Sequence, residues 1–171
     1  DTCWEYQQRG LHKEFTTGNN DADGVYFLHW VQKKFPAKAA NIRARLAQWG
    51  GNSSGVNVAN IDNLGNVHPD TMWWHYSLGN IRERPFSEIW MDLSDPLMAG
   101  LKQSPRSVSG RCGDCQHFDI CNGNTRVRAQ QLTGDAWAED PGCYLDDEEI
   151  GVESGHERLR VSPYIRLRRA S

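Results

Sequence analysis

The chain has 171 residues, 38% of them hydrophobic and 24% charged, and it carries a formal net charge of −3. A charge this small gives no reason to expect a nucleic-acid or membrane partner, and no apolar run approaches the roughly 20 residues that span a bilayer. Five cysteines, three of them crowded into one short segment, argue against a secreted disulfide framework and favour metal ligation in a reduced, cytoplasmic setting.

Two helices are predicted near the start of the chain. Apolar residues recur at helical spacing over residues 21–35, and Asp21 or Asp23 can cap the first turn. Pro36 ends this helix and begins a second one, since proline is tolerated in a first turn. We expect the second helix to run to about Trp49, where two glycines provide a stop.

A β-hairpin is predicted next. The period of the apolar residues changes to two over residues 56–61, and a turn leads to a return strand at residues 67–68. Asp95 is then placed to cap a helix whose first position is a proline. The two helical patterns that follow the hairpin cover residues 85–93 and 96–101.

Four cysteines in the second half of the chain form the most informative motif. They follow the pattern C-x2-C-x5-C with a fourth cysteine in a turn-like segment, and they are Cys112, Cys115, Cys121 and Cys143. Four thiolates gathered in this way can close a tetrahedral zinc site or hold one iron–sulfur cluster. Spacing alone leaves both open, and a zinc site could also use three cysteines with His117. Cys3 stands apart and is interpreted as an ordinary thiol.

The segments around this motif resemble the SPASM/twitch C-terminal extension of radical SAM enzymes. The resemblance covers roughly residues 50–146, and its strongest segments are residues 65–69, 78–83, 86–90 and 110–121. It implies that Cys112, Cys115, Cys121 and Cys143 bind one auxiliary [4Fe-4S] cluster. Full SPASM domains hold a second auxiliary cluster, whose cysteines would fall within residues 50–55, at Asp70 and at Thr125. None of these positions is a cysteine here, so the resemblance implies a single, fully ligated cluster.

Within this group, residues 49–55, 66–70, 122–129 and 140–145 are similar to NirJ-type proteins of haem d1 biosynthesis, and haem synthases of the sirohaem-dependent route are neighbours. The resemblance implies a radical SAM enzyme that modifies the propionate side chains of a didecarboxysirohaem-like tetrapyrrole. The auxiliary cluster would relay electrons, with an electron donor protein as partner.

One expected motif is missing from the sequence. The C-x3-C-x2-C pattern that holds the SAM-binding cluster does not occur in the 171 residues. We therefore expect S-adenosylmethionine and a second [4Fe-4S] cluster to be bound upstream of Asp1, and we expect this chain alone to be inactive.

Three residues are candidates for contact with the substrate. Arg126 and Arg128 follow Cys121 closely, and guanidinium groups pair well with carboxylates such as those of a sirohaem-type substrate. Arginines here could also raise the reduction potential of a nearby anionic cluster. His68 lies near the hairpin. The alternatives are solvated surface arginines and a histidine that packs or is exposed. No catalytic residue can be named from the sequence.

The expected fold is α+β with three parts. Residues 1–55 would form the C-terminal end of a partial (β/α) barrel, and residues 56–145 a SPASM/twitch-like domain with a β-hairpin and helices around the cluster. Residues 146–171 would form a C-terminal tail. Two other functions stay open, a SPASM-type peptide-modifying maturase and a zinc-binding structural or interaction module.

Overall fold

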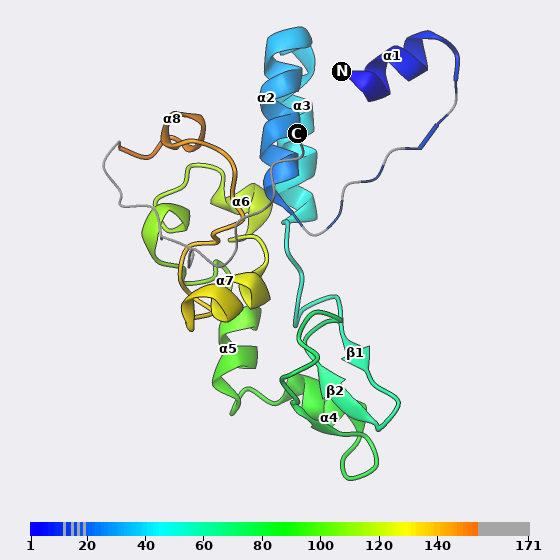
Figure 1. Cartoon of the computed structure of the whole chain (residues 1–171), viewed down its shortest axis with the longest axis vertical. Helices are drawn as coiled ribbons and strands as arrows, with labels where there is room; N and C mark the ends of the chain where they lie inside the picture. The colour runs from blue at the N-terminus through cyan, green and yellow to red at the C-terminus, as the bar shows by residue number, and fades with distance from the viewer. Residues whose placement is uncertain (12, 15, 17, 19, 154–171) are drawn as a thin grey trace, which may run out of the picture.

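A computed structural model describes residues 1–11, 13, 14, 16, 18 and 20–153 of the chain (Figure 1). The helices are α1 (Thr2–Gln8), α2 (Ala22–Lys34), α3 (Pro36–Trp49), α4 (Phe86–Met91), α5 (Pro96–Lys102), α6 (Phe118–Cys121), α7 (Arg126–Thr133) and α8 (Asp147–Ile150), with a 3-10 turn, η1 (Gly110–Cys112), before α6. The strands are β1 (Asn60–Ile61), β2 (Asn66–His68) and β3 (Gly79–Asn80).

Helices α2 and α3 form a hairpin. Helix α6 packs against both of them near the end of α3, where the chain leaves toward the sheet (Figure 1). Phe35 lies between the two helices, and Pro36 occupies the first turn of α3, where its missing N–H is not needed. Gly50 ends α3 in the left-handed conformation, with φ of 76°. Both helices lie where the sequence predicted them.

The three strands form one small antiparallel sheet in the order β1-β2-β3. Asn60 pairs with His68, and Asn66 pairs with Asn80. Helix α4 covers β3, and α5 begins with the predicted cap, since the Asp95 carboxylate accepts a hydrogen bond from the backbone N–H of Met98 at 2.9 Å.

The predicted strand over residues 56–61 is wrong for its first four residues, because β1 contains only the last two. The backbone N–H groups of Val56, Asn57 and Val58 all donate to the carbonyl of Ser53, which folds this segment into a tight turn. Gly55, with φ of 73°, provides the conformation that this turn needs. Local hydrogen bonds therefore outweigh the alternating pattern.

The buried side chains fall into two clusters. One joins α2 to the cysteine-bearing loops, and the other surrounds α5 and α7 beside the sheet. The first consists of Ala22, Val25, Leu28, Ile120, Leu145, Ile150 and Val152. The second consists of Trp73, Leu97, Met98, Leu101, Val127 and Ala136. Cys115 and Cys143 pack against the first cluster, so the cysteine motif lies at the edge of a formed core.

The assignments to a partial barrel and to a SPASM/twitch-like domain stay predictions. Of the predicted tail, the structure describes residues 146–153, which include α8, and residues 154–171 lie outside the described part. Across the residues that are described, no helix is both long enough and apolar enough to cross a membrane.

Candidate metal centre

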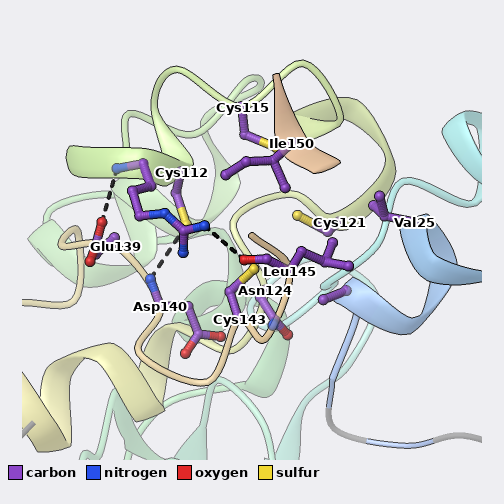
Figure 2. Close-up of a pocket in the computed structure, with 12 residues that line it drawn as sticks. Val25, Cys112, Cys115, Cys121, Asn124, Glu139, Asp140, Cys143, Leu145 and Ile150 are labelled. Atoms are coloured by element: carbon purple, nitrogen blue, oxygen red, sulfur yellow. Dashed lines mark hydrogen bonds between the residues drawn. The ribbon is translucent and has the colours of Figure 1, made fainter. Parts of the chain in front are cut away.

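The four cysteines of the motif line one pocket. Figure 2 shows their sulfur atoms around a common gap, which each side chain approaches from a different side. Val25 from α2, Leu145 and Ile150 add apolar side chains to the lining. The structure thus brings together the four predicted ligands, Cys112, Cys115, Cys121 and Cys143, from separate segments.

Short turns position each of these cysteines. Cys112 ends η1, and the N–H of Cys115 donates to the Cys112 carbonyl at 3.4 Å, so the C-x2-C pair shares one turn. Cys121 is the last residue of α6. Cys143 closes a turn in which its N–H donates to the carbonyl of Asp140 at 3.0 Å. These local bonds fix the directions of the thiols before any ligand binds.

A glycine from the α3 end allows the chain to pass directly behind Cys121. A Cβ atom on Gly51 would lie 2.4 Å from the carbonyl carbon of Cys121, a distance that no real side chain tolerates. The N–H of Asn52 then donates to the Cys121 carbonyl at 3.3 Å. The cysteine loop is therefore held against the segment that follows α3.

Backbone N–H groups point at two of the sulfurs. The amide of His117 donates to Cys115 Sγ, and the amide of Asp140 donates to Cys112 Sγ, each at 3.4 Å (Figure 2 shows the second). Such bonds favour a negatively charged sulfur and are a usual feature around metal-bound thiolates.

Burial in this pocket disfavours negatively charged sulfur unless a positive charge is bound beside it. Burial raises the pKa of Cys115 to about 11 and that of Cys121 to about 12, and burial likewise raises the pKa of Cys112. Without a cation these thiols stay protonated at neutral pH. Metal ligation supplies the missing charge and displaces the protons. Four sulfur donors in an apolar, amide-lined pocket fit an iron–sulfur cluster or zinc by their chemistry.

In the described part of the chain, no three His, Cys, Asp or Glu side chains are grouped so that they could hold a single metal ion. A tetrahedral zinc ion with Zn–S bonds of about 2.3 Å places its sulfurs only about 3.8 Å apart. His117 also does not line the pocket, because its Nε2 lies 3.2 Å from Nε2 of His29.

Two partly buried ion pairs flank the pocket. Nε of Arg111 donates to Asp147 at 2.6 Å, and its guanidinium also reaches the carbonyl of Leu145. Arg128 donates to Asp140 at 2.6 Å, and the Asp140 side chain is fully buried. The sequence alone did not single out Asp140, although it lies three positions before Cys143.

The three candidate substrate contacts occupy different environments. Arg126 is fully buried and donates to backbone carbonyls, so the alternative of a solvated surface arginine is wrong for it, and its interior position gives no support to substrate contact. Arg128 keeps 27% of its side chain exposed and pairs with Asp140. His68 is 3% exposed, with Nδ1 2.7 Å from the Tyr76 carbonyl and Nε2 3.4 Å from Asp62, so it packs within the hairpin.

The positions that lack the cysteines of a second cluster also meet in space. Residues 51–54, Asp70 and Thr125 line one further pocket, which we call the polar pocket. Its central carboxylate, Asp70, accepts hydrogen bonds from Ser54 Oγ and from the N–H groups of Met72 (2.6 Å) and Trp73 (3.3 Å). Hydrogen-bonded oxygen and nitrogen atoms thus line the pocket where the cysteines of a second cluster would lie.

The chain is similar to proteins named for haem d1 and haem synthesis. It is 54% identical over 158 residues to a protein named pre-heme d1 synthase from Dinoroseobacter shibae, which is 92% of this chain and 39% of that relative. It is 48% identical over 147 residues to a protein named Fe-coproporphyrin III synthase from Methanosarcina barkeri, which is 84% of this chain and 37% of that relative. A protein named AdoMet-dependent heme synthase from Nitratidesulfovibrio vulgaris is 34% identical over 89 residues, which is 52% of this chain and 23% of that relative.

These relatives confirm the predicted resemblance to NirJ-type haem d1 biosynthesis proteins. The chain spans less than two fifths of the length of the first two. No family model matches the chain, and no solved structure matches it.

Proposed function

We propose that this chain is the auxiliary-cluster part of an AdoMet-dependent radical enzyme of haem d1 or haem biosynthesis, with one [4Fe-4S] cluster on Cys112, Cys115, Cys121 and Cys143. The observation that carries the proposal is the convergence of these four cysteines on one pocket. The names of the relatives, which concern pre-heme d1, Fe-coproporphyrin III and AdoMet-dependent haem synthesis, support the pathway.

The residues of the chain have a defined share in this function. The four thiolates bind the iron, and the amides of His117 and Asp140 stabilise the charge on two of the sulfurs. Apolar residues such as Val25, Leu145 and Ile150 keep water from the site. When bound, the cluster supplies one-electron transfer to or from a substrate. With all four ligands from protein, no iron is left open for substrate.

The rest of the activity belongs to sequence outside this chain. We propose that S-adenosylmethionine and a second [4Fe-4S] cluster bind there, that the substrate is a didecarboxysirohaem-like tetrapyrrole, and that an electron donor protein serves the cluster in the cytoplasm. The chain by itself is then inactive. Arg126, Arg128 and His68 as substrate contacts stay predictions.

Metal analysis of anaerobically prepared protein tests the proposal. We expect about four iron and four sulfide per chain, with the broad visible absorption of an iron–sulfur cluster and an electron paramagnetic resonance signal after reduction. One zinc per chain, without iron, sulfide or charge-transfer absorption, would refute it in favour of the zinc-binding module.

A cysteine exchange tests the fourth ligand. We expect Cys143→Ala to lose most of its iron, because Cys143 is the cysteine that the loop before α8 brings to the pocket. Cys3→Ala is the matched control, since Cys3 is exposed on α1 and should leave the iron content unchanged. Equal iron in both variants would show that Cys143 is no ligand.

A further inference from the structure

Arg126 differs from the other arginines that surround the cysteine pocket. Arg111 and Arg128 each form an ion pair with a buried or half-buried aspartate, which cancels their charge locally. Arg126 is 0% exposed, and none of the ion pairs found among the described residues includes it. A buried charge without a paired ion is unusual and calls for a compensating charge.

The position of the Arg126 side chain is fixed by backbone carbonyls. Its terminal nitrogens donate to the carbonyl of Ala136 at 3.0 Å, to that of Ala138 at 2.6 Å and to that of Gly123. Gly123 follows Cys121, and the Ala136–Ala138 segment leads toward the loop of Cys143. The guanidinium therefore lies between two of the segments that carry ligands.

One N–H donor of this guanidinium makes no hydrogen bond. Nε of Arg126 is buried and has no hydrogen-bond partner in the structure, although an orphaned buried N–H is rare. The negative charges that act on Arg126 are those of Cys112, Asp140 and Cys121, and they oppose the effect of burial, which lowers its pKa. Asp140 is already paired with Arg128. With iron bound, the negative charge that remains for Arg126 is that of the ligating thiolates.

We propose that Arg126 raises the reduction potential of the cluster by acting as its buried counter-charge. The inference rests on the proposed cluster. One-electron reduction adds one negative charge to the cluster, and a fixed positive charge in a medium of low polarity stabilises the more negative form. Because carbonyls hold the guanidinium in place, its contribution does not depend on a flexible side chain.

The test is a redox titration of the anaerobic protein with dithionite, followed by electron paramagnetic resonance. In Arg126→Gln the charge is lost, and we expect the reduction equilibrium to move at least tenfold toward the oxidised form, which corresponds to about 59 mV for a one-electron couple. Arg126→Lys keeps the charge and should shift the equilibrium less.

Arg106→Gln is the matched control. Arg106 is also a buried arginine held by carbonyls, those of Leu101, Ser54 and Asn122. The charges that act on it are those of Arg126, Asp21 and Asp70 rather than those of the cysteines. We expect the reduction equilibrium of the cluster in this variant to differ from that of the wild type by less than a factor of two. A shift in Arg106→Gln as large as that in Arg126→Gln would overturn the proposal.

Every remaining outcome decides the question. Equal potentials in wild type and Arg126→Gln overturn the role of Arg126. If Arg126→Gln binds no iron but Arg126→Lys does, the charge serves to hold the cluster, and the role in setting its potential is overturned. Loss of iron from both variants would assign Arg126 to holding the loops instead. Wild-type protein without any iron would refute the proposed function rather than this inference.

Discussion

The polar pocket and the cysteine pocket are neighbours in this chain, and they differ in how their buried polar atoms are stabilised. In the polar pocket, the Asp70 carboxylate has three donors of its own, from Ser54, Met72 and Trp73. In the cysteine pocket, buried and partly buried sulfurs lie among mostly apolar surfaces, and backbone N–H groups donate to Cys112, Cys115 and Cys121. The carboxylate of the first pocket has its hydrogen-bond donors in the folded chain, whereas the sulfurs of the second can bind a metal in place of their protons. Complete hydrogen bonding and ligand binding are thus alternatives at adjacent places in one fold.

The largest expected effect comes from removing the iron. Chelation under oxidising conditions should lower the free energy of unfolding by about 4 kcal/mol or more, because a ligand that binds only the folded state stabilises it. Hydrogen exchange checks this locally: amides of residues 110–121 and 140–145 should lose protection, while Met72 and Trp73 in the polar pocket keep theirs. Uniform loss of protection would remove the contrast between the two pockets.

The next effect concerns the contact between Gly51 and the backbone of Cys121, which separates the two pockets. Gly51→Ala should cost about 3 kcal/mol, because the new Cβ would meet the backbone of Cys121 and φ at this position is 65°. Iron content should fall as well, since the Cys121 loop must move. Gly134→Ala is the control: it carries a comparable strain, with φ of 84°, but a Cβ there meets nothing within 4 Å. Iron measured in both variants separates the effect on the cluster from the strain.

A smaller effect is expected within the polar pocket. Asp70→Ala leaves the donors of Ser54, Met72 and Trp73 without their acceptor, and unsatisfied buried groups of this kind cost about 2 kcal/mol. Chemical unfolding measures this loss, and Asp70→Asn, which keeps an acceptor, should lose less. Iron content should stay at the wild-type value in both variants, and a parallel loss of iron would show that the two pockets depend on each other.

A pH dependence that exists only without iron comes last, because it leaves the stability at neutral pH unchanged. Burial raises the pKa of Cys115 to about 11 and that of Cys121 to about 12. A raised pKa contributes stability that is present below the thiol's unfolded value of about 8.5 and is lost as the pH rises toward the folded value. Iron-free protein should therefore lose stability between about pH 9 and 12, as followed by thermal unfolding. Cys121→Ala should lose less over the same range.

Much of this fold could be predicted from local rules. Helices α2 and α3 begin and end close to the expected residues, because Pro36 and Gly50 act through their own backbone preferences. The Asp95 cap has the same origin. The strand predicted from residue 56 is wrong because the Ser53 carbonyl collects three amides in a turn, a choice that alternating apolar residues do not reveal.

The sequence predicted the candidate ligands of the site but not their surroundings. The spacing of the cysteines indicated a shared site, since C-x2-C turns have few other uses in a polar, glycine-rich segment. The burial of Arg126 and the pairing of Arg128 with Asp140 could not be predicted, because adjacent arginines look alike until the packing of α7 assigns one to the interior.

The sequence by itself determined which side chains can bind metal, because three closely spaced cysteines and a fourth at residue 143 provide the thiolates that such a site needs. Only the tertiary structure showed that the predicted fourth cysteine reaches the same pocket from a distant loop, and that the positions around Asp70 line a hydrogen-bonded one. The reason is physical. Ligand chemistry is a property of single residues, whereas convergence and burial depend on contacts between segments far apart in the chain.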